Sequence, residues 1–260
     1  EFDTAALRRV IHKLNQVASG SPSEDADQSP YIKVSVVTQD GSHRLRLQAS
    51  NKRMTQWLGC SIAPEAFTAD SEGSFCVPAN TILRVLALCP SDRVTIAIDA
   101  GSLTIHEERE GGSTHTIGTM PADSWLTVKR FDGEPRELRV PRRVLSEVAT
   151  NLSFAVSQDD SRAPLTGIHM KFEGGSLKAQ ATNNFSAALW ECQDAGIEAA
   201  APVELLLLPD VVKKLGTLVD KDIDAIDIEL ESAMVVFATP RMRFRASLEV
   251  SMESYPDLRK

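Results

Sequence analysis

Four acidic residues near the end of the chain have the spacing of a calcium-binding loop. In such a loop, carboxylates at the first, third, fifth and twelfth positions ligate the ion, and glycine at the sixth allows the sharp turn. The matching residues are Asp220, Asp222, Asp224 and Glu231, but the sixth position holds alanine. Because an internal repeat also assigns residues 226–230 to a strand, we predict a solvated turn and no metal site.

The histidines and cysteines do not form a recognisable site either. No histidine has another His or Cys at ligand spacing, and the cysteines lack a Cys-x-x-Cys pair. A Ser-His-Asp order, a nucleophile elbow and a phosphate-binding glycine loop are also missing. We therefore predict a protein that is not an enzyme and needs no cofactor, with buried, reduced thiols that suit the cytoplasm.

Charge and hydropathy limit the class of protein further. The net charge of −8 argues against nucleic-acid binding by the whole surface, but a local basic face remains open. The run Glu107-Glu108-Arg109-Glu110 precedes two glycines and predicts a solvated hairpin tip. No stretch approaches the roughly 18 apolar residues of a membrane helix, so we expect a soluble protein without a membrane partner. The opening residue Glu1 is not Met, which is typical of a cloned fragment, so we expect sequence beyond either end.

An internal repeat of about 130 residues is the strongest pattern in the chain. Gln-Ala-Ser-Asn at 48–51 returns as Gln-Ala-Thr-Asn at 180–183, and Arg-Arg-Val-Ile at 8–11 returns as Arg-Arg-Val-Leu at 142–145. A repeat of this length is a whole domain used twice. We predict one domain at 3–126, a linker at 127–136 and a second domain at 137–260.

Each repeat predicts two helices and about eight strands. Residues 5–17 follow helical spacing after Asp-Thr, which can cap a helix, and residues 19–30 read as an acidic loop. Alternating apolar residues around a glycine turn predict hairpins at 32–49 and 168–181. This order predicts the α+β class, with an antiparallel sheet and both helices on one face. The remaining elements are helices at 78–89 and 209–221 and strands at 94–98, 103–106, 226–230 and 234–238.

Several short sequences, in this order, resemble one known family. Val77-Pro78-Ala79 opens a helix, and Met120-Pro121-Ala122-Asp123 closes the first repeat. In the second repeat, Leu-Thr-Gly-Ile at 165–168, Ala-Thr-Asn at 181–183 and Tyr-Pro-Asp at 255–257 follow in order. The plan resembles the first and second domains of the bacterial sliding clamp, the beta subunit of DNA polymerase III. The resemblance implies two tandem sliding-clamp domains.

The resemblance also implies an assembly around DNA. Clamps of this family form a ring of six domains, with sheets outside and helices lining a hole that holds duplex DNA. The bacterial ring joins two chains of three domains, and this chain resembles only the first two domains. A ring could therefore be a homotrimer of two-domain chains, or the chain could be part of a longer clamp.

Basic residues concentrate on the predicted helices, which carry nine basic and three acidic side chains. Such a surface attracts phosphates independently of base sequence, and its contribution falls as salt rises. An ordinary solvated helix face is the alternative explanation. With Arg162 from the loop at 158–164, the candidate residues facing double-stranded DNA are Arg8, Arg9, Lys13, Arg84, Arg142, Arg143, Arg162, Lys213 and Lys214.

The family's partner groove takes short peptide motifs from polymerase and clamp loader. The resemblance implies that Leu165, Thr182 and Pro256 contribute to it here. The Asp-Gly-His-Arg-Leu that normally follows the threonine is replaced at 183–187 by Asn-Asn-Phe-Ser-Ala, and a third domain would supply the other wall. These departures indicate a clamp fold with altered contacts.

Two functions remain open from the sequence. The first is a non-enzymatic clamp-like protein that tethers a partner by forming, or contributing to, a ring around duplex DNA. The second is a clamp-fold dimerisation or ligand-sensing module of a transcription regulator whose MerR-like helix-turn-helix would precede Glu1. The first predicts a trimeric ring of two-domain chains, and the second predicts a dimer.

Overall fold

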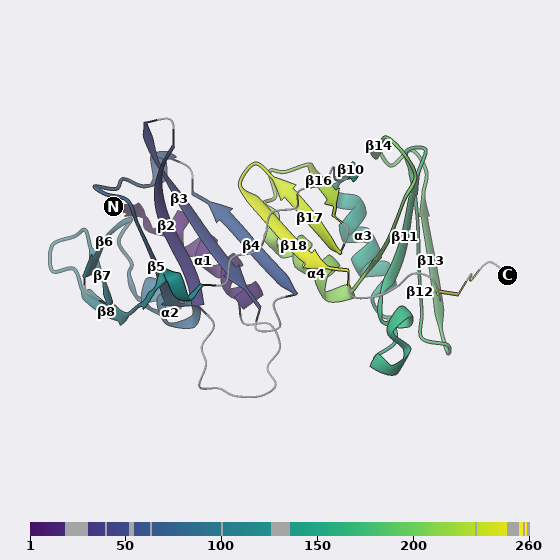
Figure 1. The fold of residues 1–260 in the computed structure, drawn as a ribbon, viewed down its shortest axis with the longest axis horizontal. Coiled ribbons are helices and arrows are strands. Elements are labelled where there is room, and N and C mark those ends of the chain that lie inside the picture. Colours follow the sequence, from purple (N-terminus) through teal and green to yellow (C-terminus); the bar gives the residue numbers. More distant parts are fainter. Residues whose placement is uncertain are drawn as a thin grey trace. The chain divides into compact units, whose positions relative to one another are not determined.

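The computed structural model describes residues 1–18, 31–39, 41–51, 55–62, 64–99, 101–125, 136–231, 233–248, 255–256 and 258. They fall into two compact units, Glu1–Arg130 with Arg241–Phe244, and Phe131–Pro240 with Arg245–Lys260 (Figure 1). The predicted acidic loop at 19–30, and all but the last residue of the predicted linker at 127–136, lie outside the described residues. The domain bounds of the sequence analysis therefore stay a prediction.

The first unit begins with a short strand and a long helix. Asp3 accepts a hydrogen bond from the Ala6 backbone N–H at 2.7 Å and so caps the first turn, as the sequence predicts. Its described helices are α1 (Thr4–Ala18), α2 (Ala79–Leu88) and the short η1 (Pro64–Ala66) and η2 (Ala122–Ser124). Its described strands are β1 (Phe2–Asp3), β2 (Tyr31–Gln39), β3 (Ser42–Ser50), β4 (Gln56–Ser61), β5 (Gly73–Pro78), β6 (Arg93–Asp99), β7 (Ser102–Glu107), β8 (Thr114–Gly118) and β9 (Met120–Pro121).

Two antiparallel sheets make up the first unit. One has the order β4-β3-β2-β5-β9, and the other has the order β1-β6-β7-β8. In the β2–β3 hairpin, Val34 pairs with Leu47 and Val36 with Leu45. The buried residues of β3 alternate with exposed ones, so one face of the hairpin points inward. Helix α1 packs against α2, β3 and β4, which places both helices against the sheets (Figure 1).

The second unit repeats this plan. Helix α3 packs against α4, β10 and β12. The strands pair in two separate orders, β13-β12-β11-β15 and β14-β10-β16-β17. Its described helices are α3 (Arg142–Leu152), η3 (Asp160–Thr166) and α4 (Pro209–Leu218). Its described strands are β10 (Arg136–Pro141), β11 (Ile168–Glu173), β12 (Ser176–Thr182), β13 (Ala187–Cys192), β14 (Glu198–Ala199), β15 (Val203–Leu207), β16 (Ala225–Leu230) and β17 (Met234–Thr239), and β18 (Met242–Ser247) is the last strand described.

The predicted α+β class with antiparallel sheets is confirmed, and most element bounds agree within a few residues. Helix α4 is shorter than predicted, because the chain turns to an extended conformation at Val219 (φ −78°, ψ 128°). Lys221 therefore lies in the following turn and on no helix. Strand β16 occupies the predicted strand at 226–230, next to the acidic loop considered for calcium. In the part of the chain that the structure describes, no helix has the length and hydropathy to cross a membrane.

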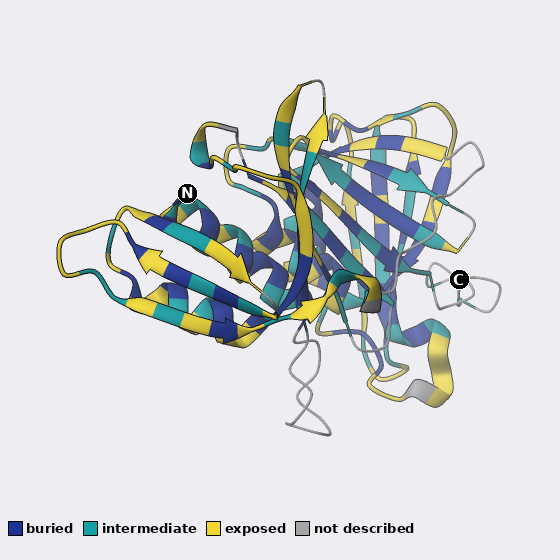
Figure 2. Ribbon diagram, turned by 60° about the vertical axis from the view of Figure 1, so that its left-hand side comes forward, coloured by how far each residue is buried: buried dark blue, intermediate teal, exposed yellow. Residues whose placement is uncertain are grey.

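Aliphatic and aromatic residues make up the interior of each unit. Figure 2 shows the buried residues in dark blue along the helices and strands. In the first unit Ile11, Leu14 and Leu47 are fully buried, so α1 and the β2–β3 hairpin share one core. In the second unit Phe172 and Phe237 are fully buried. Burial of apolar side chains is the main stabilising contribution to such a fold, and it fixes which faces of the helices remain available to ligands.

Candidate functional site

The basic residues of α1 are not equally available. Arg9 and His12 are exposed on the outer face of the helix. The guanidinium of Arg8 donates to the carbonyl oxygens of Leu86 at 2.5 Å and Cys89 at 2.9 Å, and so binds the end of α2. Only 9% of Lys13 is exposed. Neither Arg8 nor Lys13 presents its charge as predicted, because each side chain is engaged or enclosed within the unit.

The other three helices offer a similar mixture. Arg84 on α2, Arg143 on α3 and Lys213 on α4 are exposed. Arg142 is half-buried, and its backbone N–H donates to the carbonyl oxygen of Asp224 at 2.8 Å, where α3 begins. Lys214 is only 14% exposed and its ammonium pairs with the Asp210 carboxylate at 2.8 Å. That pair compensates the charge of Lys214 locally.

The exposed basic set on the helices is therefore smaller than the sequence predicts. It consists of Arg9, Arg84, Arg143 and Lys213, with exposed acids at Glu147 and Asp210. Each unit supplies two of the four cations, one from each of its helices. Such a set can bind phosphate oxygens without reading bases.

Arg162 is held by an ordered turn rather than by a loose loop. The carboxylate of Asp159 accepts hydrogen bonds from the Ser161 backbone N–H at 3.0 Å and from its hydroxyl at 2.6 Å, which begins η3. Both bonds lower the pKa of Asp159, and the bond from the Ser161 hydroxyl has the larger effect. The guanidinium of Arg162 lies 3.9 Å from the same carboxylate and is 56% exposed. Arg162 therefore remains accessible, next to an acidic neighbour.

The three predicted groove residues lie on elements that meet at one end of the β11–β12 pair. His169 is opposite Gln180, so the end of η3, which carries Leu165, is next to the Thr182 end of β12 (Figure 1). The Tyr255 hydroxyl donates to the Gln180 carbonyl at 3.1 Å and brings Pro256 to the same strand. Leu165 and Thr182 are only 8% and 5% exposed, so they offer little surface of their own.

The tight turn after Thr182 presents a residue that sequence reasoning passed over. The side-chain oxygen of Asn183 accepts hydrogen bonds from the backbone N–H groups of Phe185 at 3.0 Å and Ser186 at 2.8 Å. Asn184 takes a left-handed conformation (φ 72°), which asparagine tolerates well. Phe185 is 98% exposed at the tip. The signal was an aromatic residue inside a turn-forming Asn-Asn-Phe-Ser sequence.

The repeated asparagine has the same structural task in the first unit. The side-chain oxygen of Asn51 accepts hydrogen bonds from the backbone N–H groups of Thr55 at 2.8 Å and Gln56 at 3.0 Å. Asn51 and Asn183 each follow the second strand of a hairpin and join it to the next strand. The landmark that revealed the repeat is therefore a structural turn residue in both units.

Glu107 was predicted in a solvated hairpin tip, but its side chain is fully buried. The Ser113 backbone N–H at 2.9 Å and hydroxyl at 2.8 Å donate to it, and the Arg109 guanidinium lies at 3.2 Å. These donors lower the pKa of Glu107 to about 2. The Ser113 backbone N–H has the largest effect, followed by the Ser113 hydroxyl, the Ser91 backbone N–H and Arg109. This carboxylate organises the β7–β8 turn and faces no site.

The acidic loop near residue 220 does not gather its carboxylates around one point. Asp220 accepts the Ile223 backbone N–H through its carbonyl at 3.1 Å, and Glu231 pairs with Arg245. Within the described ranges, no group of three or more His, Cys, Asp or Glu side chains is placed to hold a metal ion.

Comparison with known proteins finds one family that this chain resembles. Residues 139–257 match the family model described as the central domain of the DNA polymerase III beta subunit. The curated beta sliding clamp of Bacillus subtilis is 23% identical over 193 residues, which cover 74% of this chain and 50% of that protein. The chain spans about half the length of the curated relatives it matches first.

Solved structures of sliding clamps have a similar fold over almost the whole length of this chain. The beta chain of DNA polymerase III from Streptococcus pneumoniae superposes with a TM-score of 0.84 at 15% identity, covering 98% of this chain and 65% of that one. The Helicobacter pylori beta clamp bound to a DNA ligase peptide has a TM-score of 0.77 at 16% identity, covering 99% and 68%. At these identities the likeness is one of fold. With the family match over 139–257 and the curated relatives, it makes the chain similar to the bacterial sliding clamps.

Proposed function

We propose that the chain is a non-enzymatic, clamp-like protein that associates with duplex DNA and tethers a partner by contributing to a ring. The observation that carries the proposal is the paired arrangement of exposed cations on the helices. Arg9 and Arg84 in one unit, and Arg143 and Lys213 in the other, occupy the helical layer that the family turns toward DNA.

Charge segregation within each unit supports this proposal. The chain carries a net charge of −8, yet its exposed helix faces have four basic residues against two acidic ones. A basic surface on an acidic protein favours approach of one face to the phosphates and disfavours the others. The bonds that hold Arg8 and Lys214 inside their units leave a modest cationic set, which suits a protein that slides more than one that binds tightly.

The partner would dock beside the turn at 183–186. The solved Helicobacter pylori clamp, whose fold is similar, was bound to a DNA ligase peptide, which shows that such a fold can take a peptide ligand. In this chain Leu165 and Thr182 are nearly buried, whereas Phe185 is 98% exposed. We infer that Phe185 supplies the main apolar contact and that Leu165, Thr182 and Pro256 form the floor beneath it.

Retention on circular DNA tests encirclement. The full chain is loaded on nicked circular DNA and on the same DNA made linear, and retention after a salt wash is measured. A ring that surrounds DNA stays on the circle and slides off the ends of the linear molecule. Equal retention on both would contradict a topological link. A trimer in analytical ultracentrifugation would agree with a closed ring of two-unit chains.

Charge reversal tests the DNA-facing residues. The double variant Arg9→Glu with Arg143→Glu should bind DNA more weakly, and the log–log dependence of affinity on salt should lose about 0.9 per phosphate contact removed. Arg46→Glu with Lys178→Glu is a matched control, because it makes the same charge change, one per unit, on exposed strand positions that alternate with buried ones. The proposal predicts a larger loss for the helix pair.

Peptide binding tests the docking site separately. A fluorescent peptide carrying the polymerase's clamp-binding motif is titrated with the chain and with Phe185→Ala. Loss of at least about tenfold in affinity is expected for an exposed aromatic anchor. Phe154→Ala is the control, because Phe154 is also an exposed aromatic residue of the same unit, at 69% exposure. Equal effects of the two variants would contradict the assignment of Phe185.

The regulator-module alternative remains a prediction. It expects a dimer, no salt-sensitive DNA association by this chain, and no difference between the two charge-reversal variants. The experiments above therefore distinguish it without a further assay.

A further inference from the structure

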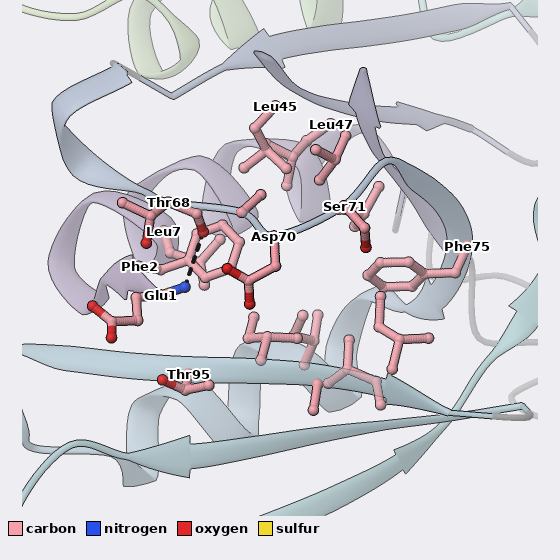
Figure 3. Close-up of a pocket in the computed structure, with 18 of the residues that line it drawn as sticks. Glu1, Phe2, Leu7, Leu45, Leu47, Thr68, Asp70, Ser71, Phe75 and Thr95 are labelled. Atoms are coloured by element: carbon pink, nitrogen blue, oxygen red, sulfur yellow. Dashed lines mark hydrogen bonds between the residues drawn. The ribbon is translucent and has the colours of Figure 1, made fainter. Parts of the chain in front are cut away.

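A cavity of about 430 Å³ opens between the two sheets of the first unit (Figure 3). Protein interiors pack closely and hold few voids larger than a water molecule. This volume is in the range of small-molecule sites, which are about 300–1,000 Å³. The wall comes from α1, the β2–β3 hairpin, β6 and β7, and it is largely aliphatic. Its apolar residues include Leu7, Ile11, Val36, Leu45, Ile96 and Leu103.

The repeat explains how the cavity arises. In the first unit Val36 pairs with Leu45 on one side and with Gly73 on the other. In the second unit the same three places hold Phe172, Leu177 and Val203. The leucine is common to both, but the first unit has valine for phenylalanine and glycine for valine.

The smaller side chains of the first unit are also less buried than their counterparts in the second. Phe172 is fully buried and Val203 is 2% exposed, whereas Val36 is only half-buried. A Cβ atom added at Gly73 would meet nothing within 4 Å. The first unit therefore lacks side-chain volume at the place where the second is filled. The same backbone is stable when this place is closed, so the opening is not required by the fold.

The mouth of the cavity is polar and includes two acidic side chains, Glu1 and Asp70. It is bordered by Thr68, Asp70, Ser71 and Thr95, and Figure 3 shows the carboxylate of Asp70 directed into the space between its own segment and the facing strand. Asp70 is exposed, and no hydrogen bond or ion pair to it occurs among the described residues. The other acidic side chain at the rim, Glu1, faces Arg93 at 3.3 Å, and the Glu1 amino group donates to the Thr68 carbonyl at 3.0 Å.

We propose that this cavity binds a small amphipathic molecule with an aliphatic body and a cationic head group. The aliphatic body replaces the phenylalanine and valine side chains that fill the second unit. The head group lies at the mouth, where the unpaired carboxylate of Asp70 and the Thr68 and Ser71 side chains can receive a protonated amine. An anionic head would be repelled by Asp70, and a neutral head would leave that charge uncompensated.

Calorimetric titration of the full 260-residue chain with n-octylamine tests the proposal. The amine is protonated at neutral pH. Saturable binding of one molecule per chain is expected, at least about tenfold tighter than binding of n-octanol or n-octanoate. Equal affinity for the three compounds would overturn the assignment of a cationic ligand, and absence of saturable octylamine binding would overturn the site.

Two variants that close the cavity locate the ligand. Val36→Phe and Gly73→Val each restore a side chain found in the second unit, and each should weaken octylamine binding by about tenfold or more. Val37→Phe is the matched control, because the next residue of β2 points to the opposite face. Its affinity should change by less than about twofold. Unchanged affinity in both cavity variants, with circular dichroism showing that they fold, would place the ligand elsewhere.

Asp70→Asn isolates the charge. It keeps the shape of an exposed side chain, so it should fold normally and bind octylamine no better than octanol. If octylamine still binds more tightly than octanol to this variant, Asp70 is not the group that recognises the head.

Discussion

The two units have the same strand order but fill their interiors differently. Phe172 closes the space between the layers in the second unit, whereas Val36, at the matching place, borders a cavity of about 430 Å³ in the first. The repeated Arg-Arg pair also lies at different places: α3 begins at Arg142, whereas α1 begins at Thr4, four residues before Arg8. Arg8 binds two carbonyl oxygens at the end of α2, and Arg142 begins α3 through its backbone. Hydrogen-bonded strand register has been kept through the duplication, while side-chain volume has diverged.

That difference indicates a division of labour. Backbone pairing needs only alternation of apolar residues, so it tolerates exchange of phenylalanine for valine. Close packing of the core is lost in the same exchange, because each missing methylene leaves unfilled volume. The tightly packed second unit is suited to hold a rigid turn at 183–186, and the looser first unit is suited to take up a ligand.

The largest expected effect comes from opening the second unit. Phe172→Ala should lower the free energy of unfolding by about 3–5 kcal/mol, because a fully buried ring is removed. Val36→Ala should cost only about 1 kcal/mol, since valine is half-buried beside a cavity that already exists. Guanidinium unfolding followed by circular dichroism measures both. Similar losses would mean that the first unit is packed as tightly as the second.

The next largest effect is a difference in stability between variants of Arg8 and Arg142. Arg8→Met removes two hydrogen bonds from a charged donor and should cost about 1.5–3 kcal/mol. Arg142→Met keeps the backbone bond that begins α3 and should cost less than about 0.5 kcal/mol. Thermal unfolding of the two variants gives the comparison. A larger loss for Arg142 would mean that its side chain, and not only its backbone N–H, supports the start of α3.

A smaller and equal effect is expected from the two turn asparagines. Asn51→Ala and Asn183→Ala each leave two backbone N–H groups without their acceptor, at a cost of about 1–2 kcal/mol. Phe185→Ala should stay within about 0.5 kcal/mol, because the ring touches solvent. Urea unfolding of the three variants is the measurement. A strong loss for Phe185 would show that it supports the fold rather than a partner.

The last effect is the dependence of stability on pH that Glu107 gives to the first unit. Its folded pKa of about 2 lies below the ordinary value of 4.5. Its contribution is therefore present in full above about pH 4.5 and is lost as the pH falls toward 2. Guanidinium unfolding between pH 5 and 2 should show this decline, and Glu107→Gln should make that part of the profile flatter. An unchanged profile in the variant would assign the acid sensitivity to other carboxylates.

Sequence reasoning reached the fold because its signals are local. The hairpin around Gly41 and the capping Asp3 depend on neighbours in the chain, and the structure has them where expected. The burial of Lys13 and Glu107 depends on which distant strands and loops enclose them, so no local pattern reveals it. The small side chain of Val36 beside Gly73, where the second unit has Phe172 beside Val203, becomes visible only when strand register is known.

The candidate site was predictable in part for the same reason. Helical spacing correctly separates the outer Arg9 from the inner Leu7, but it cannot tell that Arg8 reaches the end of another helix. The groove residues were carried over from a resemblance, and their low exposure follows from packing around β12. Phe185 stands out only because the Asn183 turn fixes it in solvent.

The bond from Tyr255 to β12 also gives the protein a built-in optical signal. The chain has only two tyrosines, and burial raises the pKa of Tyr255 to about 12. If the segment around Tyr255 leaves β12, the phenol returns toward its ordinary pKa of 10 and ionises earlier in an alkaline titration. Ultraviolet absorbance of phenolate therefore reports, without any label, what fraction of the molecules keep this segment docked beside the strand that ends at Thr182.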